Sequence, residues 1–157
     1  MVIQELAEFA AIIKKHDRLL GLDLGTKTIG VAISDVMRMV ASPVETLEKG
    51  KFSKDVVKLK ALIAKEEVGG IVLGLPREMD GTDGKRSQST RAFASNLSRE
   101  IDLPILLWDE RLSTVAVERT LIGEADMTRK RRAEVVDRAA AAYILQGVLE
   151  ALEYQHG

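Results

Sequence analysis

The chain has 157 residues, 46% of them hydrophobic, and its formal net charge is −1 at pH 7. This length and apolar fraction fit one compact domain with a substantial core. The near-zero charge argues against a histone-like polyanion binder, although it leaves room for a local basic patch. The chain has no cysteine, so oxygen ligands would have to hold any metal. No apolar run reaches the roughly 20 residues of a membrane span, and the N-terminus lacks the basic start of a signal peptide. We therefore expect a cytoplasmic protein without membrane contact.

The first residues show an amphipathic pattern. Apolar side chains between Val2 and Ile13 recur at helical spacing, which predicts a helix over about residues 2–15. We expect this helix to pack on the domain. The predicted organisation is thus an N-terminal amphipathic helix in residues 1–17, followed by the main domain in residues 18–157.

Two apolar strands joined by a tight turn come next, over residues 19–24 and 27–33. Asp23 lies near the end of the first strand. A buried carboxylate is costly unless it is paired or bound to a cation. Asp23 therefore either holds a metal or caps the turn that follows it, and both interpretations stay open on this stretch alone.

Strands and helices alternate along the rest of the chain. A third strand over residues 40–47 contains Pro43, which cannot donate a ladder hydrogen bond and so predicts a sheet edge. The following pattern predicts a helix over 51–67 ended by Gly69-Gly70, a strand over 71–75, a polar loop over 76–84, a helix over 85–100, a strand over 104–108, a short helix near 113–122 and a long helix over 129–154. This order predicts a mixed five-stranded α/β sheet, in the order 3-2-1-4-5 counted along the chain, flanked by helices.

Acidic residues mark element ends or faces that can converge. They are Asp23, the pair Asp109-Glu110 and Asp137. In open α/β sheets, sites form at the carboxyl ends of the strands. Helical spacing puts Asp137 on an apolar face, where a lone carboxylate needs a partner. That partner is either a shared cation or an arginine such as Arg138 or Arg111.

Four short motifs follow one another along the chain. They are Gly21-Leu22-Asp23-Leu24-Gly25 with Ile29-Gly30-Val31-Ala32, then Gly74-Leu75-Pro76 with Met79-Asp80-Gly81-Thr82, then Asp109-Glu110-Arg111-Leu112-Ser113, and finally Asp137-x-x-Ala140-Ala141-x-x-Ile144-Leu145-Gln146. In this order they resemble the YqgF or RuvX family, and the resemblance covers Arg18 to about Leu152. Members of this family are described as pre-16S ribosomal RNA nucleases, once proposed as Holliday junction resolvases, with a ribonuclease H-like fold.

The resemblance implies a ribonuclease H-like fold and a divalent-metal-dependent nuclease. Its catalytic residues would be Asp23, Glu110 and Asp137, which would hold Mg²⁺ or Mn²⁺, with Asp109 as a further candidate ligand. Related resolvases often carry a second aspartate three positions after the first on the last helix, where this chain has Ala140. The implied substrate is the 5′ end of pre-16S rRNA in ribosome biogenesis. Branched DNA is the alternative substrate, and a non-catalytic RNA-binding assembly factor is the alternative function.

Basic residues near these carboxylates are candidates for holding the phosphate backbone. They are Arg77, Lys85, Arg86, Arg91, Arg111, Arg129, Lys130 and Arg131. An aromatic content of 4% offers no stacking platform for single-stranded bases. Monomer and homodimer both stay open, because a resolvase would need a symmetric dimer to cut two strands, whereas an RNA-trimming enzyme can act as a monomer.

Overall fold

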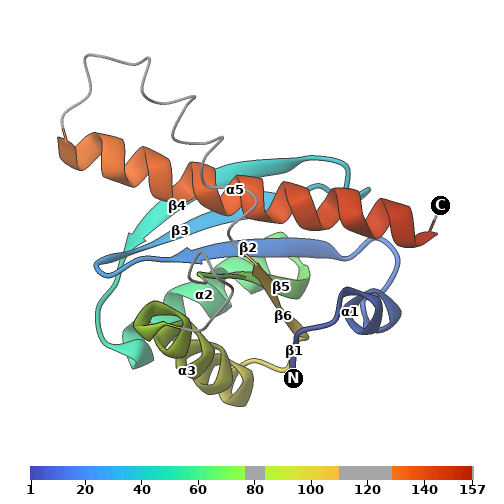
Figure 1. Cartoon of the computed structure of the whole chain (residues 1–157), viewed down its shortest axis with the longest axis horizontal. Coiled ribbons are helices and arrows are strands. Elements are labelled where there is room, and N and C mark those ends of the chain that lie inside the picture. Colours follow the sequence, from blue (N-terminus) through green and yellow to red (C-terminus); the bar gives the residue numbers. More distant parts are fainter. Residues whose placement is uncertain (77–83, 110–128, 157) are drawn as a thin grey trace.

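The computed structural model describes residues 1–76, 84–109 and 129–156, and at residues 129–135, 137, 155 and 156 it describes the backbone alone. The described elements are β1 (Val2–Ile3), α1 (Leu6–Ile12), β2 (Arg18–Leu24), β3 (Thr28–Ser34), β4 (Ala41–Glu48), α2 (Phe52–Glu66), β5 (Val68–Leu75), α3 (Lys85–Glu100), β6 (Ile105–Asp109) and α5 (Arg129–His156). Figure 1 shows α5 running across one side of the sheet. None of the described helices is long and apolar enough to cross a membrane.

The strands form one mixed sheet in the order β1-β6-β5-β2-β3-β4. β1, β6, β5 and β2 run parallel, whereas β3 is antiparallel to both β2 and β4. The five strands expected from the sequence have the expected neighbours. The sheet has a sixth strand, however, because β1 extends it beyond β6.

The predicted helix over residues 2–15 is wrong at both ends, since α1 covers only Leu6–Ile12. Val2 and Ile3 pair instead with Ile105 and Leu106 of β6. β-branched side chains suit a strand, and Ile3 becomes buried at the edge of β6. The helical spacing of the apolar residues therefore concealed a two-residue strand.

The prediction of β4 as an edge strand is confirmed. Pro43 pairs with Ala32 where the β3–β4 register shifts after Val31. The proline lacks an N–H group, so an edge position with an irregular ladder is where it costs least.

Gly69 and Gly70 do not end the preceding helix, contrary to the sequence-based prediction. The helix cap is Glu67, in a left-handed conformation with φ of 53°, and both glycines lie inside β5. A Cβ atom at Gly70 would lie 2.9 Å from the Leu19 side chain and 3.1 Å from the Phe9 ring. The absence of a side chain here lets α1 pack closely on the sheet.

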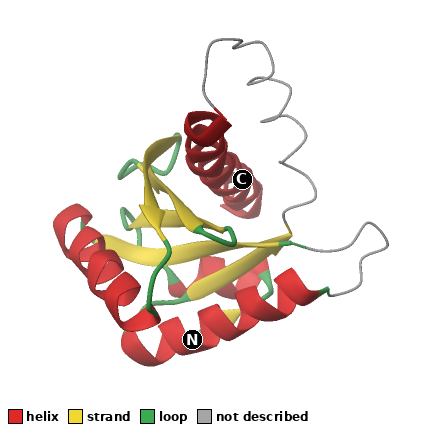
Figure 2. Cartoon of the chain, turned by 90° about the vertical axis from the view of Figure 1, so that its left-hand side faces the viewer, coloured by secondary structure: helices red, strands yellow, loops and turns green. Residues whose placement is uncertain are grey.

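Two hydrophobic cores lie on opposite faces of the sheet. Figure 1 shows α5 on one side of the sheet and α2 and α3 on the other, and Figure 2 shows the helix that carries the C-terminus on one side of the strands. One core lies between the sheet and helices α2 and α3, and includes Leu22, Leu24 and Leu107. The other lies beneath α5 and α1, and includes Leu19, Phe9 and Leu145. Along β2, β3, β5 and β6 the side chains alternate between these two cores.

Candidate active site

Asp23 lies near the carboxyl end of β2, on the face of the sheet that α5 covers. Leu22 and Leu24 on either side of it belong to the core beneath α2 and α3, so alternation directs Asp23 to the α5 face. The residue is only 6% exposed. Asp23 takes part in a polar or electrostatic interaction, and its buried Oδ1 atom accepts no hydrogen bond within the described residues. A buried negative charge in this position favours a nearby cation.

Gly21 brings α5 close to this part of the sheet. A Cβ atom at Gly21 would lie 2.9 Å from Cβ of Leu145 and 3.0 Å from the carbonyl oxygen of Ala141. Gly21 precedes Asp23 by two residues and therefore lies on the same face. The backbone of Asp137 lies in α5, one turn before Ala141.

Gln146 attaches α5 to the sheet near the start of β2. Its Oε1 atom accepts a hydrogen bond from the Ala41 backbone N–H at 2.8 Å, and its Nε2 atom donates to the Met39 carbonyl at 3.1 Å. Ala41 pairs with Ser34, whose hydroxyl accepts from the Leu19 N–H near the start of β2. The earlier turns of α5 extend toward the turn between β2 and β3 (Figure 1), and Asp23 lies near this end of β2.

Asp109 lies at the end of β6 but on the opposite face from Asp23. Ile105 and Leu107 belong to the core beneath α2 and α3, so alternation directs Asp109 to that side. Trp108 lies on the α5 side, where it packs against the other core. Glu110 lies outside the described residues.

The basic residues expected from the sequence are only partly described. Lys85 and Arg86 lie exposed in the first turn of α3, and Arg91 follows on the same helix, half-buried and engaged in an interaction. Arg77 and Arg111 lie outside the described residues. Arg129, Lys130 and Arg131 form the first turn of α5, where the backbone alone is described.

A cavity of about 250 Å³ lies beside the turn between β2 and β3. Its lining residues are Leu24, Gly25, Thr26, Lys49, Lys85, Arg86, Ser89 and Thr90. The sequence analysis missed Lys49. This lysine follows β4 directly, and no local pattern distinguishes it from other lysines of the chain.

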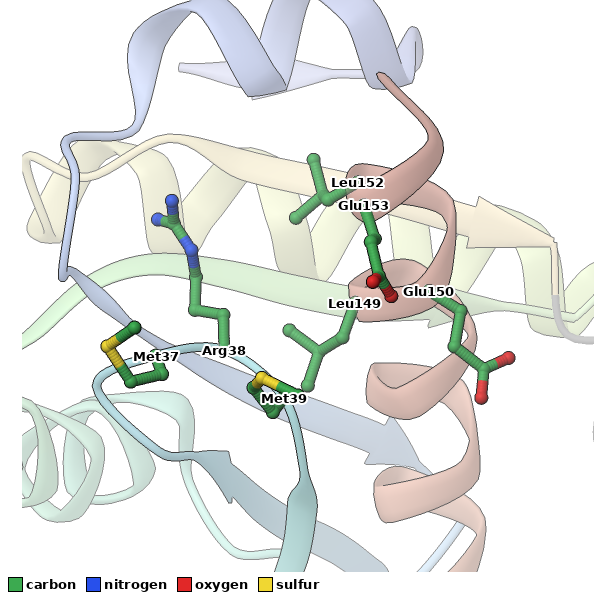
Figure 3. A pocket seen from close by; sticks show the side chains of 7 residues that line it. All are labelled: Met37, Arg38, Met39, Leu149, Glu150, Leu152 and Glu153. Atoms are coloured by element: carbon green, nitrogen blue, oxygen red, sulfur yellow. The ribbon is translucent and has the colours of Figure 1, made fainter. Parts of the chain in front are cut away.

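A second cavity, of about 200 Å³, lies at the other end of α5. Figure 3 shows Met37, Arg38 and Met39 from the connection between β3 and β4 beside Leu149, Glu150, Leu152 and Glu153 from α5. It is separated from Asp23 by the length of the sheet, so it does not belong to the candidate site.

Carboxylate oxygens are the ligands that Mg²⁺ and Mn²⁺ prefer, so the donor chemistry of Asp23 fits such an ion. Within residues 1–76, 84–109 and the described side chains of α5, no group of three or more acidic or histidine side chains lies together. This statement does not cover two of the expected ligands, because Glu110 and the Asp137 side chain lie outside the described part of the chain.

Comparisons with known proteins give consistent results. A family model described as RuvX, Holliday junction resolvase, matches residues 17–151. A Rhodospirillum rubrum protein named as a pre-16S rRNA nuclease is 61% identical over 155 residues, which cover 99% of this chain and 96% of that protein. A Cereibacter sphaeroides protein of the same name is 57% identical, and the match covers 98% of this chain and 96% of that protein.

Solved structures show the same fold at low sequence identity. Thermus thermophilus RuvC in complex with a Holliday junction substrate has a TM-score of 0.53 and 11% identity, over 89% of this chain and 96% of that chain. The yeast mitochondrial Holliday junction resolvase Ydc2 has a TM-score of 0.53 and 14% identity, over 95% of this chain and 86% of that chain. These likenesses support the ribonuclease H-like arrangement of the sheet and helices.

Proposed function

Since the chain belongs to the RuvX family, we propose that it is the nuclease that processes the 5′ end of pre-16S rRNA during ribosome biogenesis. The chain is a nuclease with a ribonuclease H-like fold, and such nucleases depend on divalent metal ions. The precursor rRNA substrate is suggested by the names of relatives that match nearly the whole chain.

The observation that carries the proposal is the placement of Asp23. A carboxylate that is 6% exposed lies at the carboxyl end of a central parallel strand, on the face covered by α5. Ala141 of α5 packs over Gly21, and Asp137 lies one turn before Ala141 on the same helix. Helical spacing therefore favours Asp137 as the second carboxylate of the site.

We assign the third carboxylate to Glu110. Alternation along β6 directs Asp109 toward α3, away from the Asp23 face, which favours the neighbouring glutamate. Asp23, Glu110 and Asp137 would then hold Mg²⁺ or Mn²⁺. Such an ion would orient the attacking water and offset the negative charge that develops on the phosphodiester. With the buried Ala140 in place of a second aspartate, α5 contributes one carboxylate to this set.

The first test uses a labelled RNA that spans the 5′ end of the 16S rRNA precursor, with Mg²⁺ or Mn²⁺ titrated. We expect the wild-type protein to cleave it and Asp23→Asn to lose roughly 100-fold or more in rate, because the variant lacks an anionic metal ligand. Asp35→Asn, which changes an exposed aspartate at the other end of the sheet, is the matched control and should cleave normally. Cleavage by a clean preparation of Asp23→Asn at the wild-type rate would contradict the proposal.

A second measurement follows metal binding without catalysis. A ligand that binds only the folded protein raises its stability by RT ln(1 + [L]/Kd). Mn²⁺ should therefore raise the thermal unfolding temperature of wild type and Asp35→Asn, but have little effect on Asp23→Asn. Equal shifts in all three proteins would place the metal elsewhere.

A DNA junction resolvase is the second candidate. It is favoured by the description of the matching family model and by the shared fold with RuvC. The same variants should be assayed on a four-way DNA junction. Metal-dependent cleavage of the junction without cleavage of the RNA would favour this alternative. RNA binding without cleavage of either substrate would favour an assembly factor.

A further inference from the structure

We propose that the cavity beside the β2–β3 turn binds one backbone phosphate of the nucleic-acid strand, and that Lys49 contacts this phosphate together with Lys85 and Arg86. The inference rests on the proposed nuclease function and specifies how the substrate is held. The cavity lies against Leu24 and Gly25, which directly follow Asp23 in the chain.

Three cationic side chains from two separate parts of the chain meet in this cavity. Lys49 follows β4, whereas Lys85 and Arg86 begin α3. The Lys49 backbone N–H donates to the Lys27 carbonyl at 2.9 Å, which holds the end of β4 beside the turn. The Thr90 hydroxyl donates to the Arg86 carbonyl at 2.9 Å and supports the first turn of α3.

None of these three cations forms an ion pair with a carboxylate of the described residues. The Lys49 ammonium donates to the Gly25 carbonyl at 3.3 Å, and the Arg86 guanidinium donates to the Leu24 carbonyl at 3.4 Å. Both distances are at the long end for hydrogen bonds. An ammonium group has three donors and a guanidinium five, so most donors of this pair are available to an anion.

The lining of the cavity favours a phosphate over a base or a nucleotide. Hydroxyl groups of Thr26 and Ser89 add two further donors. None of the lining residues is aromatic, so a base would have no ring to stack on. A volume of about 250 Å³ is also below the usual range for a small-molecule site.

The cavity and Asp23 lie at the same end of β2, on opposite faces of the sheet. Gly25 is two residues beyond Asp23, or roughly 7 Å along an extended strand. The Leu24 side chain and α3 belong to one face, whereas Asp23 faces α5. A nucleic-acid strand that passes over the end of β2, from one face of the sheet to the other, would place the scissile phosphate near Asp23 and another of its phosphates in the cavity.

The test measures RNA binding in EDTA, so that cleavage does not interfere. Each phosphate contact contributes about 0.7 to 0.9 to the slope of log affinity against log salt concentration. Lys49→Gln should therefore reduce the magnitude of that slope by about this amount and weaken binding several-fold at low salt. Lys49→Arg keeps the charge and should retain the slope. Lys65→Gln, an exposed lysine at the far end of α2, is the matched control and should behave as wild type.

A scan with neutral methylphosphonate linkages then identifies the phosphate. At one position near the cleavage site, the neutral linkage should weaken RNA binding by the wild-type protein clearly more than RNA binding by Lys49→Gln, in which only Lys85 and Arg86 remain to contact that phosphate. If Lys49→Gln keeps the wild-type slope, the inference is overturned even where Asp23→Asn abolishes cleavage. If the slope falls but cleavage does not depend on Asp23, the phosphate site stands and the proposed catalytic mechanism fails.

Discussion

Among the described residues, Asp35 is the one whose ionisation is most clearly coupled to the fold. Its Oδ1 atom accepts hydrogen bonds from the backbone N–H groups of Met39 at 2.7 Å and Val40 at 3.0 Å. The hydrogen bond from Val40 is the main cause that lowers the pKa of this carboxyl below 3.8, while slight desolvation opposes it. Because the pKa is lower in the folded state, the charged form stabilises the protein above the unfolded-state pKa. This contribution is lost as the pH falls through the folded-state pKa.

We therefore expect Asp35→Ala to lower the free energy of unfolding by roughly 0.5–1 kcal/mol near neutral pH, a small effect because the side chain is exposed. The difference from wild type should shrink once the pH falls below the folded-state pKa. Urea unfolding of both proteins at neutral and at strongly acidic pH measures this difference in the free energy of unfolding. A difference that does not change with pH would mean that the charge of Asp35 is not involved.

Single residues of the site differ in how far the sequence can reveal them. Asp23 could be singled out as a candidate because a carboxylate inside a short apolar strand needs an explanation, and the structure shows that it is buried there. The sequence could not reveal which face of the sheet Asp109 occupies. That face is defined only because β6 continues through Asp109. Lys49 could not be predicted either, since its cavity forms only when the end of β4 meets the β2–β3 turn and α3.

At the scale of elements, the packing of α5 on β2 depends on the missing side chain at Gly21. An added methyl group would lie 2.9 Å from Cβ of Leu145 and 3.0 Å from the Ala141 carbonyl, so the helix would have to shift. We expect Gly21→Ala to lower the free energy of unfolding by about 1–3 kcal/mol. It should also reduce cleavage, because α5 carries Asp137. Denaturant unfolding and the RNA cleavage assay measure the two effects.

Gly147 in α5 is the control for this prediction. A Cβ atom there would lie 3.5 Å from Nε1 of Trp108, which is ordinary van der Waals contact. Alanine also favours a helix over glycine by roughly 0.5–1 kcal/mol. Gly147→Ala should therefore leave stability unchanged or raise it. If both alanine variants were equally stable, the close packing of α5 at Gly21 would be disproved.

The elements themselves were predicted unevenly from the sequence. α3 and the edge strand β4 could be predicted because helical periodicity and Pro43 are local signals. β1 could not, since two residues acquire strand structure only by pairing with β6, about 100 positions later. The prediction that Gly69 and Gly70 end a helix was wrong. These positions lack a side chain because residues distant in sequence, such as Asp17 and Phe9, lie close to their backbone.

At the scale of the whole molecule, α1 belongs to the core beneath α5. The family match begins at residue 17, yet Phe9 is fully buried and packs in the same core as Leu145 and Val148. The ring also lies over Gly70 in β5. The N-terminal segment therefore helps to support the helix that carries Asp137, from the end of the sheet opposite Asp23.

This placement predicts that Phe9→Ala lowers the free energy of unfolding by roughly 3–5 kcal/mol, as expected for a large aromatic side chain removed from a core. Phe9→Leu retains most of the apolar volume, so its free energy of unfolding should fall clearly less than that of Phe9→Ala. Because Phe9 is remote from Asp23, the cleavage rate per folded molecule should stay close to wild type in both variants. Denaturant unfolding followed by tryptophan fluorescence of Trp108 measures the first effect, and the RNA assay measures the second. A loss below about 1 kcal/mol for Phe9→Ala would show that α1 does not pack on the domain in solution, because a buried ring cannot be removed from a close-packed core at so small a cost.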